Sequence, residues 1–212
     1  MNPPFSFLGR GKLGRALSSA LNVPCLPHTA TPKGWVVLSV PDHAIEAEAK
    51  RFPGRAVHMS GSLHVEGVPC AHPLMSFDGE PRDWTGTPLA LTGEVPNALV
   101  EAMEGRGFVP FALPAEHKAL YHAAAVLSCG HAATLWLGAM KLLADAGVQL
   151  PGDGMLPIAR ATLDNVAAHG LGGRTGPFVR GDRGTIERDA AALPAPWRDI
   201  FLTLGAAPVG EP

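Results

Sequence analysis

The segment from Phe5 to Leu17, FSFLGRGKLGRAL, constrains the fold of this chain more than any other. An apolar run leads into glycines at G-x-G-x-x-G spacing, and an apolar-patterned segment follows at once. In a strand–turn–helix unit, these glycines allow the tight turn, the approach of backbone to a diphosphate, and close packing of helix on strand. The free N–H groups of the helix then face the phosphates. The expected cofactor-binding residues are Gly9, Arg10, Gly11, Lys12, Leu13 and Gly14.

Strand-like and helix-like stretches alternate through the first half of the chain. The strands are expected at residues 5–8, 23–26, 35–40, 56–59, 70–72, 89–91 and 108–112, and the helices at 12–21, 42–51 and 95–106. Continuous apolar runs between helices indicate a parallel sheet that is covered on both faces.

The composition and the proline content of the sequence change after Pro114. Residues 115–146 contain no proline and are rich in Ala and Leu, which predicts one long buried helix. Further helices are expected at residues 156–169, 185–193 and 197–205. The chain is therefore expected to be an α/β domain of residues 1–113 followed by an all-α domain of residues 114–212.

Composition and charge argue against several classes of partner, location and metal site. The formal net charge is only −2 over 212 residues and the basic residues are scattered, so no nucleic-acid or membrane-surface partner held by charge is expected. No apolar run approaches the roughly 20 residues of a membrane helix, and no secretion signal is visible. Cys25, Cys70 and Cys129 are far apart, which favours buried thiols in a reducing cytoplasm. No histidines have metal-ligand spacing, so no metal site is expected.

Candidate ligand-binding residues lie at the ends of two of the expected strands. Val40, Pro41 and Asp42 end one apolar run, where ligands bind in open α/β folds. They are candidates for cofactor contact, although a strand end with Asp42 as helix N-cap explains the same pattern. Ser60 and Ser62 flank a glycine after the next strand, and either hydroxyl is a candidate for substrate binding or for a local turn.

His72 is the main candidate for acid–base catalysis. The proline after it biases His72 toward an extended conformation, and histidine titrates near neutral pH. A histidine bonded to a carbonyl in a turn is the alternative.

Two further groups of candidates lie in the helical half. Lys118, Tyr121 and His122 have i, i+3, i+4 spacing and share one helical face, which is suited to an anionic substrate or to packing. Asn165 lies on a second helix, and Arg180 in a Gly-rich segment is able to clamp a carboxylate or phosphate. Asp182 and Thr185 look like a helix cap.

Several motifs together resemble a known family. They are GRGKLG at Gly9, VLSVPD at Val37, HMSGSL at His58, HPLMSF at His72, LYHAAAVL at Leu120 and GPFVRGDRGTI at Gly176. The chain resembles uncharacterised Rossmann-like oxidoreductases with a helical domain of the 6-phosphogluconate-dehydrogenase-like type. Their wider relatives include pyrroline-5-carboxylate reductases and prephenate dehydrogenases.

The resemblance implies a nucleotide-binding domain, a helical domain that forms a homodimer, and a small-molecule substrate. Its similarity to prephenate dehydrogenases implies that His72 takes a proton during hydride removal and that Ser60 orients it. Relatives place a catalytic or binding lysine or histidine on the long helix, and Lys118 or His122 matches that position.

The chain departs from such domains between Gly14 and Trp35. About twenty residues are too few for the usual helix, strand and second helix, so the second helix is expected to be missing. The acidic residue that normally holds the ribose 2′-hydroxyl is absent after Leu26, whereas His28, Thr29, Thr31 and Lys33 are suited to a 2′-phosphate. NADP is therefore favoured over NAD, for an oxo acid, hydroxy acid or imine as substrate. The alternative is a non-catalytic ligand-binding or partner-binding protein that has lost the adenosine half of its pocket.

Overall fold

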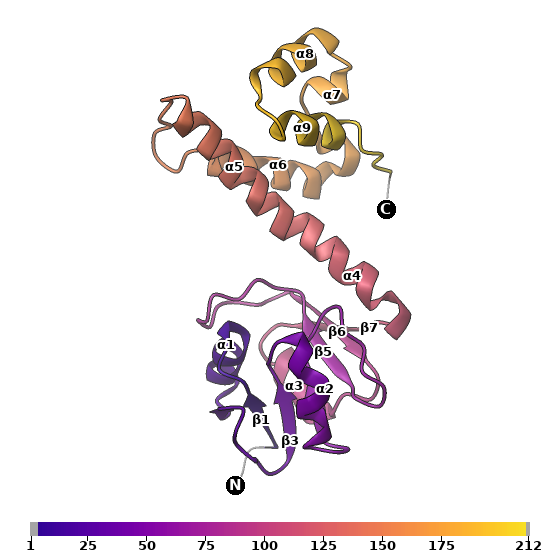
Figure 1. Cartoon of the computed structure of the whole chain (residues 1–212). Helices are drawn as coiled ribbons and strands as arrows, with labels where there is room; N and C mark the ends of the chain where they lie inside the picture. The colour runs from indigo at the N-terminus through magenta and orange to yellow at the C-terminus, as the bar shows by residue number, and fades with distance from the viewer. Residues whose placement is uncertain (1–3, 211–212) are drawn as a thin grey trace. The chain divides into compact units, whose positions relative to one another are not determined.

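The structure, a computed structural model, describes residues 4–210 and divides into two compact units that meet between Ala133 and Thr134. The first unit contains a seven-stranded sheet in the order β2-β1-β3-β4-β5-β6-β7 (Figure 1). Its strands are β1 (Phe5–Leu8), β2 (Cys25–Leu26), β3 (Trp35–Leu38), β4 (Ala56–His58), β5 (Cys70–Pro73), β6 (Pro88–Thr92) and β7 (Val109–Ala112). The expected fold class, a shortened Rossmann-type sheet followed by helices, is confirmed.

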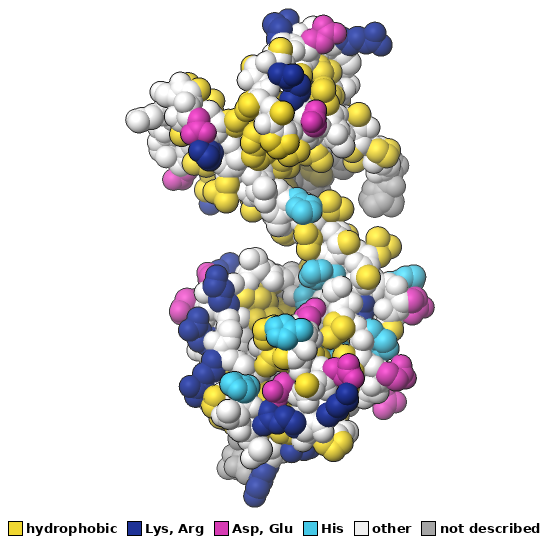
Figure 2. Space-filling view, viewed as in Figure 1, with side chains coloured by type: hydrophobic (Ala, Val, Ile, Leu, Met, Phe, Trp, Pro, Cys, Tyr) yellow, Lys and Arg dark blue, Asp and Glu magenta, His cyan; other side chains and the backbone are white. Residues whose placement is uncertain are grey.

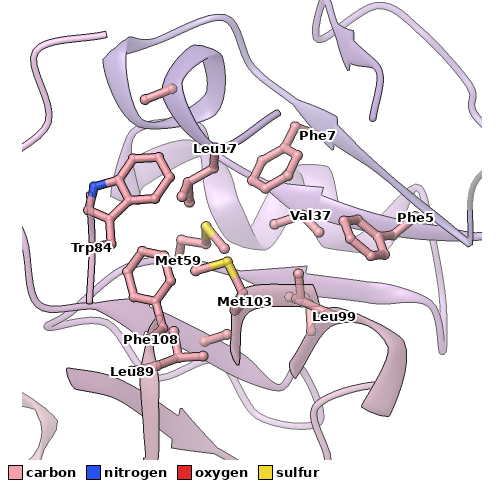
Figure 3. Packing of buried hydrophobic residues seen from close by; sticks show 13 residues of the cluster. Phe5, Phe7, Leu17, Val37, Met59, Trp84, Leu89, Leu99, Met103 and Phe108 are labelled. Atoms are coloured by element: carbon pink, nitrogen blue, oxygen red, sulfur yellow. The ribbon is translucent and has the colours of Figure 1, made fainter. Parts of the chain in front are cut away.

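Successive residues of a strand point to opposite faces of the sheet, so each strand contributes side chains to two cores. Helices cover both cores. Phe5 and Phe7 of β1 belong to the core beneath α1 (Lys12–Leu21) and α3 (Asn97–Glu104). Figure 3 shows how closely the side chains of this core pack together. Leu8 belongs instead to the core beneath α2 (Asp42–Lys50) on the other face.

The sheet is not entirely parallel, which corrects the prediction from sequence. Strand β6 pairs antiparallel with β5, whereas β7 pairs parallel with β6. A parallel return normally uses a crossover helix, and no helix occurs between β5 and β6. That connection instead buries Trp84, whose ring stacks on Phe108 with 5.4 Å between ring centroids.

Because β6 runs antiparallel to β5, the ends of β4, β6 and β7 lie at the same level of the sheet. Cys70 pairs with His58 at the end of β4 and with Thr92 at the end of β6. Leu91 pairs in turn with Ala112 at the end of β7. The chain therefore leaves β7 at the edge where β4 also ends, next to the start of α4 (Lys118–Ala125).

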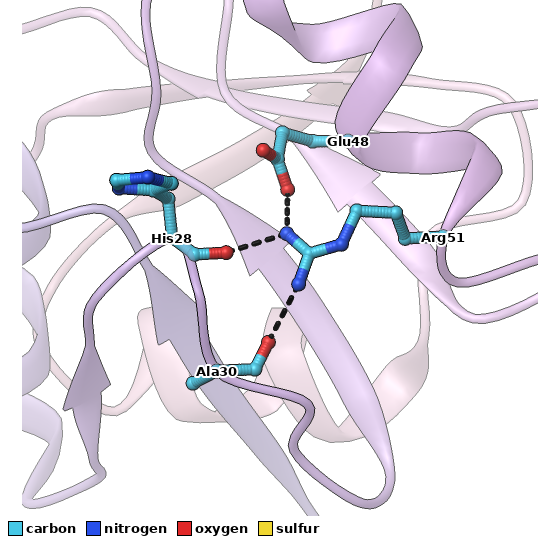
Figure 4. A network of polar contacts seen from close by, with 4 residues as sticks. All are labelled: His28, Ala30, Glu48 and Arg51. Atoms are coloured by element: carbon cyan, nitrogen blue, oxygen red, sulfur yellow. Dashed lines mark hydrogen bonds and ion pairs between the residues drawn. The ribbon is translucent and has the colours of Figure 1, made fainter.

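The shortened connection between β2 and β3 is confirmed, because no helix occurs between Leu26 and Trp35. Arg51 fixes this connection: its guanidinium donates to the carbonyl oxygens of His28 and Ala30 and also binds the Glu48 carboxylate (Figure 4).

A helical run occupies residues 115–145, one residue short of the expected end. It consists of η1 (Ala115–His117), α4 (Lys118–Ala125), a π-helical turn η2 (Val126–His131) and α5 (Ala132–Asp145). The prediction that this helix is buried is wrong for the single chain. Leu120 is 72% exposed and Leu137 is 69% exposed.

The same run bears on membrane insertion. It is 31 residues long and, by length and composition alone, apolar enough to cross a bilayer. The sequence prediction that no segment has this capacity is therefore wrong. Length and composition do not separate such a helix from one that packs on another protein surface.

The second unit has its own apolar contacts, and Figure 2 shows apolar side chains gathered over its helices. It contains α6 (Leu156–His169), η3 (Gly170–Gly173), α7 (Pro177–Arg180), α8 (Arg183–Ala192) and α9 (Trp197–Gly205). A Cβ atom at Gly138 would lie 1.9 Å from the Trp197 ring, and the Phe178 and Phe201 rings are 5.0 Å apart. Asp182 caps α8 by accepting from the Thr185 N–H, as the sequence predicts.

Candidate active site

The turn after β1 requires glycine at two of its three glycine positions. Gly9 has a φ of +112°, and a Cβ there would lie 2.4 Å from the Ser39 carbonyl oxygen. A Cβ at Gly14 would lie 2.3 Å from the Gly9 carbonyl oxygen. These two glycines therefore allow α1 to pack tightly against the ends of β1 and β3.

Gly11 differs, because a Cβ there would meet only the Ser39 oxygen, 3.9 Å away. Gly11 is the N-cap of α1, and no side chain caps this helix. The Arg15 N–H donates to the Gly11 carbonyl, whereas no acceptor among residues 4–210 binds the N–H groups of Lys12, Leu13 or Gly14. The positive end of α1 is thus free to bind an anion.

A pocket of about 410 Å³ lies at this helix terminus. It is lined by Gly9, Arg10, Gly11, Pro27, His28, Ser39, Val40, Pro41, Ala44 and Glu48. The expected Val40 and Pro41 thus share a cavity with the glycine turn. Asp42 lines a different, larger cleft. It is the first residue of α2 rather than its N-cap, which is Pro41.

The end of β2 carries no carboxylate. The Nε of Arg10 donates to the Cys25 carbonyl over 3.4 Å, which holds the guanidinium beside this strand end. Glu48 is the acidic residue of the pocket, and Arg51 neutralises it. The expected His28, Thr29, Thr31 and Lys33 are all exposed.

Ser60 is the centre of a hydrogen-bond network after β4. Its hydroxyl donates to the Asp42 carboxylate over 2.8 Å and accepts from the Leu63 N–H over 2.9 Å. Its carbonyl oxygen accepts from the Lys118 amine over 2.9 Å and from the Cys70 thiol over 3.2 Å. These two hydrogen bonds use the hydroxyl proton and one lone pair, and neither of them goes to His72.

The partner of His72 is Tyr121. The phenol oxygen lies 3.0 Å from Nδ1 of His72, and the Phe111 ring lies 6.1 Å from the Tyr121 ring. His122 packs beside the same imidazole, with 6.3 Å between ring centroids. The expected face of Lys118, Tyr121 and His122 is therefore turned toward the edge of the sheet.

Gly61 makes room for these rings. A Cβ atom at Gly61 would lie 2.8 Å from Nε2 of His72 and 2.7 Å from Cδ2 of His122. Gly61 thus allows the imidazoles of His72 and His122 to lie close to the backbone.

The environment sets the protonation of the pair. Burial and, to a smaller extent, the charges of Lys118 and His122 together lower the pKa of His72 to about 4, against the opposing effect of Asp42. Burial also raises the pKa of Tyr121 to about 12. At neutral pH His72 is therefore neutral and Tyr121 is protonated, whereas the sequence analysis assumed a histidine that titrates near neutrality.

Two buried residues of the network were missed as functional candidates. His58 is fully buried, its Nδ1 accepts from the Ser60 N–H over 3.3 Å, and burial lowers its pKa to about 4. Cys70 is buried, and burial raises the pKa of its thiol. The register of β4 against β5 places both residues together, and a single sequence does not reveal that register. Cys129 is exposed and Cys25 is partly exposed, which corrects the expectation of three buried thiols.

The remaining expected residues are exposed, and their roles stay predictions. Ser62 is exposed, and Asn165 and Arg180 belong to the second unit, where both are exposed. Within residues 4–210, no group of three or more His, Cys, Asp or Glu side chains is placed to hold a metal ion.

The fold is shared with several solved structures, whereas no curated protein matches the sequence. A candidate NADP oxidoreductase from Bacteroides fragilis is 18% identical over 96% of both chains, with a TM-score of 0.79. Protein TM1727 from Thermotoga maritima is 20% identical over 95% of both chains, with a TM-score of 0.74. A reductive aminase from Aspergillus terreus, solved with NADPH and ethyl levulinate, is 12% identical, with a TM-score of 0.67 over 97% of this chain and 92% of the aminase.

A family match covers the part of the chain that includes β6, β7 and the helices up to α9. The family described as Domain of unknown function (DUF2520) matches residues 88–207, which is more than half of the sequence. Tyr121, His122 and Lys118 all lie within this match. The chain therefore belongs to the DUF2520 family.

Proposed function

We propose that this protein is a cytoplasmic NADP-dependent oxidoreductase that acts on a small oxo acid, hydroxy acid or imine. One observation carries the proposal: the uncapped N-terminus of α1 opens into the pocket beside Gly9, Gly11 and Pro41. This is the geometry that binds a dinucleotide diphosphate. The shared fold of a candidate NADP oxidoreductase and of an NADPH-bound reductive aminase supports it.

The preference for NADP rests on charge near the end of β2. Arg10 projects beside this strand end, where NAD-binding domains place a carboxylate. A guanidinium can bind a phosphate through two N–H groups. His28 lines the same pocket and adds a second donor for the 2′-phosphate.

Bound NADPH supplies a hydride, and the chain must supply the accompanying proton. Tyr121 is the group that holds a proton at neutral pH, and its oxygen lies 3.0 Å from Nδ1 of His72. In the direction of reduction, the phenol donates to the substrate oxygen or nitrogen and is reprotonated through His72. In the direction of oxidation, the pair accepts the proton.

The protein is further proposed to be a homodimer that uses its helical half. Large apolar side chains are exposed along α4 to α6: Leu120, Leu127, Leu137, Ile158 and Leu163 are each more than half exposed. Burying such side chains against a second copy would remove them from water. Light scattering coupled to size exclusion should give twice the mass of one chain. The proposal includes no nucleic-acid or membrane partner.

Cofactor titration tests the central proposal. We expect NADPH to quench the tryptophan fluorescence saturably and NADH to bind more weakly. Gly11→Ala should weaken NADPH binding at least about tenfold without changing the melting temperature, because within the protein the added methyl group meets only the Ser39 oxygen at 3.9 Å, whereas it would crowd a diphosphate bound at this turn. Gly172→Ala is the matched control, since no atom lies within 4 Å of a Cβ there. Absence of a saturable signal at millimolar NADPH contradicts the proposal.

A non-catalytic binding protein is the second candidate, and the direct connection from β2 to β3 favours it. That connection lacks the helix that would flank the adenosine side. Absence of saturable NADPH binding by the folded wild-type protein would favour this candidate.

A further inference from the structure

Lys118 is a buried lysine at the first residue of α4, with only 1% of its surface exposed. Its amine donates to the Ser60 carbonyl over 2.9 Å and to the Cys70 sulfur over 3.1 Å. Lysines are almost never fully buried unless partners satisfy them. Because the whole residue is buried and its amine is bonded to two partners, the amine is shielded from a substrate in solution.

The two acceptors belong to neighbouring strands. Ser60 follows the end of β4, and Cys70 begins β5, which pairs with β4 at His58. Lys118 therefore ties the first turn of α4 to both strands. The rest of this helix has few buried groups, and Leu120 is 72% exposed.

Tyr121 and His122 follow Lys118 by three and four residues and so lie on its face of the helix. Their partner, His72, lies two residues after Cys70 on the same strand. A single strand thus carries both an anchor for Lys118 and the imidazole that binds Tyr121.

We propose that Lys118 is a positioning residue that fixes the first turn of α4 on Ser60 and Cys70, and thereby sets the Tyr121–His72 hydrogen bond without touching substrate. The inference rests on the proposed function only for the role of that pair in turnover. The geometric claim is independent of any cofactor. The positive charge of Lys118 also disfavours protonation of the nearby His58 and His72.

The chain contains one tyrosine, so absorbance of the phenolate reports Tyr121 alone. Lys118→Met keeps the length of the side chain and removes the donor. We expect the pKa of Tyr121 to fall by about one unit or more toward its ordinary value of about 10, as the loosened helix exposes the phenol. The pKa of His72, followed by NMR, should rise above about 4, and Lys118→Arg should restore it in part. Lys141→Met, at a lysine with 74% side-chain exposure, is the control that should change neither titration. A folded Lys118→Met protein with both titrations unchanged would overturn the proposal.

Amine labelling of the native protein needs no variant and so covers the case in which Lys118→Met does not fold. With acetic anhydride and mass spectrometry, Lys12, Lys33, Lys50 and Lys141 should be acetylated at once, since all four are exposed. Lys118 should stay unmodified until urea unfolds the chain. Acetylation of Lys118 at the rate of the other lysines would refute the buried anchor. Failure of NADPH to bind would count against the proposed oxidoreductase but would leave this result intact.

Discussion

The phenol oxygen of Tyr121 lies 3.0 Å from Nδ1 of His72, although the two residues are 49 positions apart in the sequence. Their rings meet edge to face at 89° with 5.5 Å between centroids. With His72 neutral and Tyr121 protonated at neutral pH, the phenol can donate to the imidazole. In the proposed function, this pair would handle the proton that accompanies hydride transfer.

Removing the phenol should separate this role from cofactor binding. Tyr121→Phe keeps the ring and deletes the hydroxyl, so we expect kcat to fall about 100-fold or more, as for the loss of a general acid. The dissociation constant of NADPH should stay within about twofold, because the phosphates bind at α1. Steady-state kinetics and fluorescence titration measure the two effects. A kcat within twofold of wild type would exclude Tyr121 as the proton donor.

Gly61→Ala should disturb both imidazoles, since the new methyl group would overlap His72 and His122. We expect a loss of about 1–3 kcal/mol in the free energy of unfolding, which is typical of overpacking in a tight core. Turnover should fall as well. Urea unfolding measures the first effect, with Gly172→Ala as the control. An unchanged midpoint would show that the rings move aside at no cost.

Gly14→Ala and Gly11→Ala should behave in opposite ways. The first places a methyl group 2.3 Å from the Gly9 carbonyl oxygen, and backbone cannot move as easily as a side chain. Gly14→Ala should therefore lower the free energy of unfolding by at least about 2 kcal/mol. Gly11→Ala should leave stability unchanged and weaken only NADPH binding. Equal stabilities of the two variants, measured by urea unfolding, would contradict the assignment of separate roles.

Arg10→Ala should reduce the preference for NADPH over NADH. Loss of a bidentate contact to the 2′-phosphate should cost about tenfold or more in NADPH affinity and leave NADH affinity nearly unchanged. Arg10→Lys should restore it only in part, because lysine lacks the planar fork. Titration of both cofactors against each variant measures the ratio. If both affinities fall equally, Arg10 contacts a group that the two cofactors share.

Stability should rise with pH between about 4 and 6.5. His58 and His72 have folded pKa values of about 4, below the value of 6.5 expected in the unfolded chain. Between these values the unfolded chain binds more protons, so acid favours unfolding; the stabilisation is complete above pH 6.5 and is lost as the pH falls toward 4. Each histidine should contribute about 2–3 kcal/mol across that range.

Urea unfolding at pH 7.5 and pH 5 measures this slope. His58→Gln should flatten it, whereas the same change at the exposed His43 should not. Equal slopes in the two variants would show that His58 is not the buried neutral group.

Local signals in the sequence predict the elements well. β1, α1, α6 and α9 have the expected bounds, because glycines, prolines and apolar periodicity mark their ends. The direction of β6 was predicted wrongly, although neither the sequence nor the structure contains a helix between β5 and β6 that could make a parallel crossover.

Local signals in the sequence also predict part of the candidate site. Helical spacing alone groups Lys118 with Tyr121 and His122. The contact between His72 and Tyr121 depends on where the start of α4 lies relative to β5. That position follows from the pairing of β4, β5 and β6, which local sequence signals do not reveal. Burial of the Lys118 amine is likewise a tertiary effect, and a lysine on an apolar helix gives no sign of it.

The reversed direction of β6 and β7 has one more consequence. It returns the chain to the end of β4 just before Lys118, so Asp42, Ser60, His72 and Tyr121 all lie ahead of Ala133. The residues of the Ser60 network and of the Tyr121–His72 pair are thus encoded in one contiguous stretch of polypeptide. Substitutions in α6 to α9 therefore leave every member of this hydrogen-bonded cluster unchanged.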